Sequence, residues 1–230
     1  MNHVANLRDC LREPIAALYD AARLLDAAAV AHMTDQRALA AQLLVSANMP
    51  VVREWLNSIW GAKSEYVRYC ATPESRPPIP KAERTPIRMP TTETKLRLHQ
   101  RDGFHCRCCG IPVIRAEVRE FFHHQYPQLH IWGAGNDNQH AAFQALWVQY
   151  DHILPHAVGG NNDFENLLIT CAACNYGRMQ FTFAEVGLHN PMTREPVRSL
   201  WDGLERVLPA SPFAAMSSNP SIERITHVER

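Results

Sequence analysis

Four cysteines of this 230-residue chain form two pairs, and two residues separate the members of each pair. The pairs are Cys106 with Cys109 and Cys171 with Cys174. This C-x2-C…C-x2-C pattern is typical of a closed zinc site with four thiolate ligands. Cys108 lies inside the first pair and is an alternative ligand to Cys109, although the two-residue spacing favours Cys109. The sequence therefore predicts a structural zinc ion.

Polar residues suited to hydrolysis surround the second cysteine pair. Asp151-His152 precedes the pair, Asn166 lies between that dipeptide and the pair, and Asn175 directly follows Cys174. Carboxylate and amide oxygens are ligands that hard divalent ions prefer. A neutral imidazole, with a pKa of about 6.5, accepts a proton from water at physiological pH. Because a structural zinc site needs none of these groups, we expect a second, catalytic centre here.

A hairpin followed by a helix is predicted to position these side chains. Residues 148–153 and 167–170 are short runs of strand-forming residues, and Gly159-Gly160 lies between them as a turn. A helix can start at Ala172 and carry Asn175 on its first turn. Neighbouring residues of a strand face opposite sides, so Asp151 and His152 serve one site only if the strand end twists or bulges.

The N-terminal part, from Leu7 to about Tyr69, has the three- and four-residue apolar spacing of helices. We expect three helices, with Pro14 in the first turn of the first and Asp35 capping the second. Asn48 followed by Pro50 would open the third. That helix carries Trp55, Ile59 and Trp60, which predicts packing within the protein, with a partner-binding face as the alternative.

Prolines and basic residues dominate the segment from Ala71 to Pro90, which predicts a linker or an extended arm. Shorter helices are expected at 94–101, 115–122 and 139–148. With 23 basic and 23 acidic residues the net charge is zero, so any nucleic-acid surface must be local. The candidate basic residues are Arg76, Lys81, Arg84, Arg88, Lys95, Arg97, Arg101, Arg178 and Arg194.

The remaining histidines and cysteines do not predict further sites. His123, His124, His130 and His140 lack the spacing of a second zinc site. Three of the seven cysteines lie outside the two pairs and are odd in number, so a disulfide framework is not expected. The chain also has no apolar run long enough to cross a bilayer and no signal-peptide pattern at its start, so we expect a cytoplasmic protein.

The ordered motifs resemble the HNH endonuclease family over roughly residues 95–182. They are Arg101-Asp102-Gly103-Phe104, Cys106…Cys109-Gly110, Asp151-His152-Ile153…Pro155, Gly159-Gly160, Glu165-Asn166-Leu167 and Cys171…Cys174-Asn175. The resemblance implies an α+β protein in which an N-terminal helical region precedes a zinc-stapled ββα-metal nuclease domain. The expected divisions are a helical region (1–70), a Pro-rich basic linker (71–93), the nuclease domain (94–185) and a C-terminal extension (186–230).

The resemblance also implies a role for each residue. His152 is the expected general base, Asp151 and Asn175 the ligands of a catalytic ion, and Asn166 the residue that orients the loop. Two positions depart from the common family pattern. Arg178 stands where a lysine is frequent and is expected to bind phosphate, and His156 follows Pro155 as a phosphate contact, a supporting residue or a surface residue.

The function expected from this resemblance is hydrolysis of DNA phosphodiester bonds by nicking or double-strand cutting, with Mg²⁺, Mn²⁺ or Ni²⁺ as catalytic ion. Restriction or anti-phage defence is the expected setting by analogy. The substrate is expected to be double-stranded DNA, and the N-terminal helices are expected to dock a protein partner or a second copy. The alternative is a non-catalytic zinc-binding module that binds nucleic acid or protein.

Overall fold

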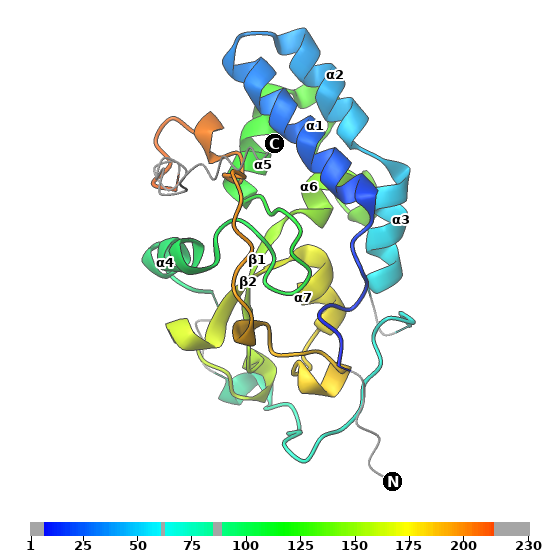
Figure 1. Cartoon of the computed structure of the whole chain (residues 1–230), viewed down its shortest axis with the longest axis vertical. Helices are drawn as coiled ribbons and strands as arrows, with labels where there is room; N and C mark the ends of the chain where they lie inside the picture. The colour runs from blue at the N-terminus through cyan, green and yellow to red at the C-terminus, as the bar shows by residue number, and fades with distance from the viewer. Residues whose placement is uncertain (1–6, 61–62, 85–88, 214–230) are drawn as a thin grey trace, which may run out of the picture.

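The computed structural model describes residues 7–60, 63–84 and 89–213. Over these residues the chain is an α+β protein with seven α-helices and one two-stranded sheet, which confirms the predicted fold class (Figure 1). Arg88, one of the predicted basic residues, lies outside them. The helices are α1 (Ala16–Met33), α2 (Arg37–Ala47), α3 (Pro50–Ile59), α4 (Thr92–Asp102), α5 (Ala116–Gln125), α6 (Ala141–Ala145) and α7 (Ala172–Arg178), and the strands are β1 (Val148–His152) and β2 (Leu167–Cys171).

The three predicted N-terminal helices are present, and α1 and α2 form a hairpin at one end of the molecule (Figure 1). Leu18 and Leu25 of α1 and Leu44 of α2 are fully buried. The predicted cap of α2 was wrong: Gln36 occupies the N-cap position, and Asp35 has a positive φ of 60° in the turn between the helices. An aspartate tolerates this left-handed conformation, so the turn uses it there.

Helix α3 packs within the chain, as the clustered aromatic and aliphatic residues predicted. Trp55 and Ile59 are each 1% exposed, and the indole nitrogen of Trp55 donates to the carbonyl of Glu13 (2.9 Å). The main partner of α3 is α6. This apolar face is therefore covered by the chain itself.

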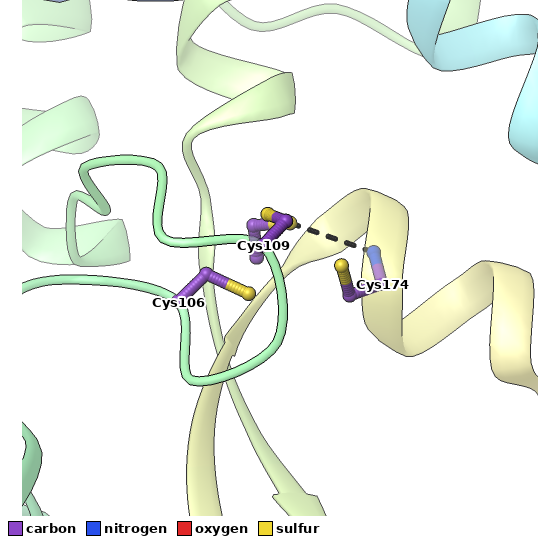
Figure 2. A group of neighbouring side chains, drawn as sticks. Cys106, Cys109 and Cys174 are labelled. Atoms are coloured by element: carbon purple, nitrogen blue, oxygen red, sulfur yellow. Dashed lines mark hydrogen bonds between the residues drawn. The ribbon is translucent and has the colours of Figure 1, made fainter. Parts of the chain in front are cut away.

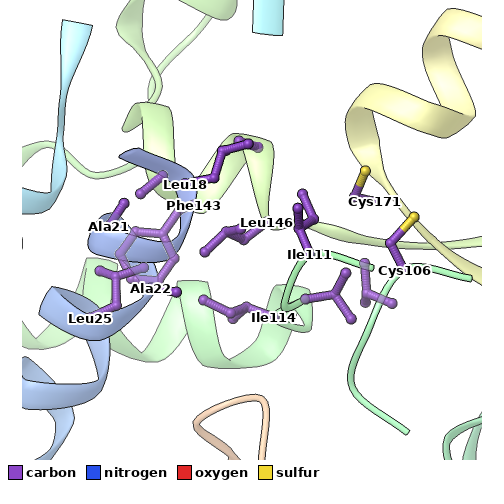
Figure 3. Close-up of a cluster of buried hydrophobic side chains, with 14 of the residues drawn as sticks. Leu18, Ala21, Ala22, Leu25, Cys106, Ile111, Ile114, Phe143, Leu146 and Cys171 are labelled. Atoms are coloured by element: carbon purple, nitrogen blue, oxygen red, sulfur yellow. The ribbon is translucent and has the colours of Figure 1, made fainter. Parts of the chain in front are cut away.

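A single hydrophobic core joins the N-terminal helices to the cysteine pairs (Figure 3). Leu18 of α1 lies beside Phe143 of α6, and Leu146 and Ile111 continue the cluster toward Cys106. Helix α6 is shorter than the predicted 139–148, and two residues separate its end from the start of β1. It therefore links the helical part directly to the hairpin.

The hairpin is regular and has helices on both faces. Antiparallel pairing runs from Val148 opposite Cys171 to His152 opposite Leu167, without a bulge. On one face the Tyr150 hydroxyl donates to His99 Nε2 of α4 (3.0 Å). On the other face Gln149 contacts α7, in accord with the alternation of side chains along a strand. Figure 1 shows α4 and α7 on either side of the two strands.

The proline-rich segment is docked on the hairpin unit. The Ile79 amide donates to the carbonyl of Ala157 (2.7 Å), and the Cys70 amide donates to the carbonyl of Glu185 (2.8 Å). The residues after α7 also fold back, because Trp201 Nε1 donates to the carbonyl of Val113 (3.0 Å). None of the helices in the described ranges is long and apolar enough to span a membrane.

Two buried histidines hold helices in place as neutral rings. His99 Nδ1 donates to the carbonyl of Gly103 (3.0 Å), and its Nε2 accepts from Tyr150. His140 Nε2 donates to the carbonyl of Leu44 (2.8 Å) and so joins α6 to α2. Burial lowers the pKa of His99 to about 3 and that of His140 to about 4, because the charged imidazolium loses its hydration.

Candidate metal and catalytic sites

The four predicted zinc ligands lie together. The sulfur atoms of Cys106, Cys109, Cys171 and Cys174 are all within 4.8 Å of one another, and three of the four residues are fully buried. Figure 2 shows the side chains of Cys106 and Cys109, from the loop after α4, pointing toward Cys174 on α7. In the described part of the chain this is the one group of histidine, cysteine and acidic residues close enough to hold a metal ion.

Local backbone geometry brings the two pairs into place. The Cys106 amide donates to the carbonyl of Ile111, and the Gly110 amide donates to the carbonyl of Cys106, each over 2.9 Å. Gly110 closes this tight turn with a φ of 78°, which favours glycine. Cys171 is the last residue of β2 and caps α7, where its sulfur accepts from the Cys174 amide (3.5 Å). The strand-to-helix junction therefore presents both downstream sulfurs on one side.

The sulfur spacing fits a tetrahedral zinc ion. Bonds of about 2.3 Å from zinc to each sulfur place neighbouring sulfurs about 3.8 Å apart. The Cys109 and Cys171 sulfurs are 3.7 Å apart. Cys108 is buried but is not a member of the group, so the geometry favours Cys109 as the ligand.

Asp151 points from β1 toward α7, where it forms an ion pair with Arg178. Arg178 Nη2 lies 2.6 Å from Asp151 Oδ2, and the two residues are 1% and 6% exposed. The other carboxylate oxygen accepts from the His152 amide (2.8 Å). Arg178 also donates to the carbonyls of His152 (2.6 Å) and Phe181 (2.5 Å). The guanidinium therefore lies inside the protein, and a contact with substrate phosphate requires this pair to open.

His152 is 6% exposed, and its ring points toward the loop between the strands. Its Nε2 lies 2.9 Å from Oδ1 of Asn162. The ring centroid of His156 is 6.0 Å away, on the short helical turn that follows Pro155. No bulge brings Asp151 and His152 to one face: they lie on opposite faces of a regular strand end, one toward α7 and one toward the loop, so they can serve one site only around the end of β1.

Asn166 closes the loop between the strands. Its Oδ1 accepts from the Leu154 amide (2.8 Å), while its Nδ2 donates to the carbonyls of Leu154 (3.2 Å) and Asn161 (2.9 Å). Gly160 passes so close to Leu154 that an added Cβ would lie 1.7 Å from the Leu154 carbonyl oxygen. Both contacts hold the far side of the loop against the end of β1.

Asn175 lies on the α7 face that packs against β1. Its Nδ2 donates to Oε1 of Gln149 (3.3 Å). Arg178, about one helical turn further along α7, donates to Asp151. Residues three apart on a helix share a face, and residues two apart on a strand share a face. Asn175 and Asp151 therefore both lie at the interface between β1 and α7, which is called the seam below.

The donor set of this seam fits a hard divalent ion. Asp151 supplies a carboxylate, and Asn175 uses its amide nitrogen on Gln149, so its amide oxygen is the atom suited to a cation. Arg178 is a competing cation on the same carboxylate. A third protein ligand is not required, because magnesium usually keeps several waters and takes one or two carboxylates.

Two residues of the site were not predicted from the sequence. Gln149 was detectable, because it lies two positions before Asp151 and so shares its strand face. Asn162 gave no signal, because it meets His152 across an irregular loop.

Residues 141–189 match a family model described as HNH endonuclease, which confirms the resemblance predicted from the sequence. The matched stretch contains both strands, α7 and the loop between the strands. The comparison with curated proteins found no match, and neither did the comparison with solved structures.

Proposed function

Because residues 141–189 match a family model described as HNH endonuclease, we propose that the chain is a divalent-metal-dependent endonuclease that hydrolyses phosphodiester bonds in DNA. The observation that carries the proposal is the placement of three side chains around the end of β1. Asp151 faces α7, Asn175 lies on the facing side of α7, and His152 faces the loop. Nothing in a purely structural zinc module requires this arrangement.

His152 is the proposed general base. A neutral imidazole removes a proton from water near neutral pH, and the resulting hydroxide attacks phosphorus. Burial of the ring and its hydrogen bond to the loop restrict it to one orientation. A restricted orientation favours proton transfer, since the base must lie within hydrogen-bond reach of the water.

Asp151 and Asn175 are the proposed ligands of the catalytic ion, which is Mg²⁺, Mn²⁺ or Ni²⁺. When bound, such an ion stabilises the negative charge that develops on the phosphate and on the leaving oxygen. Arg178 orients the Asp151 carboxylate through the 2.6 Å ion pair. Its predicted role in binding phosphate, like that of His156, remains a proposal.

Zinc is the proposed ion of the four-cysteine group, where it joins the loop after α4 to the start of α7. Its role is structural, because four thiolates close the coordination shell and leave no position for substrate. The proposed substrate is double-stranded DNA, in restriction or anti-phage defence.

The test is conversion of supercoiled plasmid to nicked or linear form by the zinc-loaded protein with added Mg²⁺ or Mn²⁺. His152→Ala is expected to lower the rate by roughly 10²- to 10⁴-fold while DNA binding is retained, because only the proton transfer is lost. A matched control is His189→Ala, which removes a histidine from the segment after α7 without touching the hairpin. EDTA is expected to stop cleavage by the wild type.

Equal activity of His152→Ala and wild type would overturn the assignment of the base. A folded, zinc-loaded protein that binds DNA but fails to cleave it with any of the added ions would instead support the non-catalytic zinc module.

A further inference from the structure

The hydrogen bond between His152 and Asn162 specifies which ring nitrogen carries the hydrogen. His152 Nε2 lies 2.9 Å from Oδ1 of Asn162. An amide oxygen can only accept a hydrogen bond, so Nε2 must donate. In a neutral imidazole that donates from Nε2, the basic lone pair is on Nδ1.

We propose that Asn162 is a positioning residue that holds His152 in the tautomer protonated on Nε2, so that Nδ1 is the nitrogen that removes the proton from water. The inference rests on the proposed function of His152 as general base and adds the atom that acts and the residue that selects it. Asn162 is proposed to act on the reaction through the ring of His152 and is therefore a positioning residue, not a catalytic one.

The loop that carries Asn162 is held by contacts on both sides of it. On the preceding side, Asn166 Nδ2 donates to the carbonyl of Asn161 (2.9 Å). On the following side, the Asn166 amide donates to the carbonyl of Asp163 (2.9 Å). Asn162 therefore lies between two backbone positions that the same residue fixes, and Asn166 in turn is bonded to Leu154 just after β1. The acceptor is presented to His152 by a closed loop.

An amide suits this task better than a carboxylate would. A carboxylate beside the ring favours the charged imidazolium, which has no lone pair for water. A neutral amide oxygen selects the tautomer without adding that charge. One neutral hydrogen bond is expected to shift the ratio of the two tautomers by roughly 2- to 12-fold.

The test is a measurement of the His152 tautomer by nitrogen-15 NMR in the zinc-loaded protein with labelled histidine. Spectra are recorded at a pH high enough that the ring signals no longer change, and the His152 signals are those missing from His152→Ala. The wild type is expected to show a hydrogen-bearing Nε2 and a bare Nδ1. Asn162→Leu is expected to shift His152 toward a mixture of tautomers, whereas Asn162→Asp, which keeps an acceptor, restores the wild-type pattern.

Cleavage kinetics provide a second readout. Asn162→Leu is expected to lower kcat by about 10- to 100-fold with little change in KM, because a misoriented base affects proton transfer and not DNA binding. The matched control is Asn161→Leu, which removes an amide from the neighbouring, exposed position whose side chain bonds only to Asp163. It is expected to keep the wild-type tautomer and a rate within about threefold of wild type.

The outcomes separate the two proposals. A wild-type ring with its hydrogen on Nδ1, an unchanged tautomer in Asn162→Leu, or an equal shift in Asn161→Leu would overturn the role of Asn162, whether or not the protein cleaves DNA. The expected tautomer in a protein that never cleaves would support the role of Asn162 in setting the ring and would refute the nuclease function alone.

Discussion

Loss of the Arg178 guanidinium should destabilise the whole hairpin unit. Arg178→Met removes the ion pair with Asp151 and the donors to the carbonyls of His152 and Phe181. It also removes the contact of the guanidinium with the ring of Phe183, whose centroid lies 4.4 Å away. The methionine replaces part of the buried volume but none of these donors.

The magnitude follows from the burial of the pair. Breaking a buried ion pair by removing one partner costs about 3–5 kcal/mol, because the other charge stays buried without compensation. Asp151 and Arg178 are 6% and 1% exposed, so solvent gives little relief. We expect Arg178→Met to lower the free energy of unfolding by about 4 kcal/mol, a large part of the 5–15 kcal/mol typical of a domain.

A double-mutant cycle separates the ion pair from the other contacts. Asp151→Asn alone should cost about 3 kcal/mol, since it leaves the guanidinium buried beside neutral groups. The double variant should be about 2–3 kcal/mol more stable than the sum of the single effects predicts, because neither charge is then left alone. The assay is urea unfolding of zinc-loaded protein followed by tryptophan fluorescence.

The exposed pair of Asp20 and Arg23 on α1 is the control. Its side chains are 48% and 73% exposed, so Arg23→Met should change stability by less than about 1 kcal/mol. Additivity of the Asp151 and Arg178 variants within about 0.5 kcal/mol would refute the ion pair as the source of the effect.

Three further perturbations test the fold and the zinc site. Cys109→Ala should abolish stoichiometric zinc binding and unfold the core, since closed thiolate sites supply about 10 kcal/mol or more of folding free energy. Cys108→Ala should retain zinc. Equal zinc contents of the two variants by atomic absorption would contradict the assignment of Cys109 as the ligand. His99 and His140 have folded-state pKa values of about 3 and about 4, against about 6.5 when unfolded, so the unfolded chain binds more protons between these values. The free energy of unfolding should therefore be highest above pH of about 6.5 and fall by roughly 1.4 kcal/mol per pH unit for each histidine as pH drops toward about 4. If His140→Gln leaves this pH dependence unchanged in urea unfolding, His140 is not its source. Gly160→Ala should cost about 2–4 kcal/mol, because its Cβ would lie 1.7 Å from a backbone oxygen, and a melting temperature equal to that of wild type would show that the loop can move aside.

The sequence was most informative where local chemistry decides the structure. Cysteine spacing identified the four clustered sulfurs, because two residues between thiolates suit one tight turn. Strand-forming residues around Gly159-Gly160 predicted the hairpin, and the start of α7 at Ala172 followed from the end of β2. The apolar face of α3 correctly predicted internal packing.

Contacts between distant residues could not be predicted in the same way. The position of Arg178 on the β1-facing side of α7 follows from helical spacing, but its burial against Asp151 depends on how closely α7 approaches the strand. Asp35 was expected to cap α2 from its propensity, yet the α1–α2 turn required a left-handed residue at that position. The docking of residues 71–84 through Ile79 has no sequence signature, since backbone hydrogen bonds are independent of side-chain type.

The placement of α6 has a consequence for how this protein can be divided. Phe143 and Leu146 are buried by residues of α1 as well as by the hairpin side of the core (Figure 3). A fragment that begins near residue 94 would present these side chains to water immediately before β1. The segment that matches the HNH model therefore depends on the N-terminal helices. A gene fusion, a truncation or a transplanted domain must carry the first 60 residues with it to keep β1, and hence Asp151 and His152, in place.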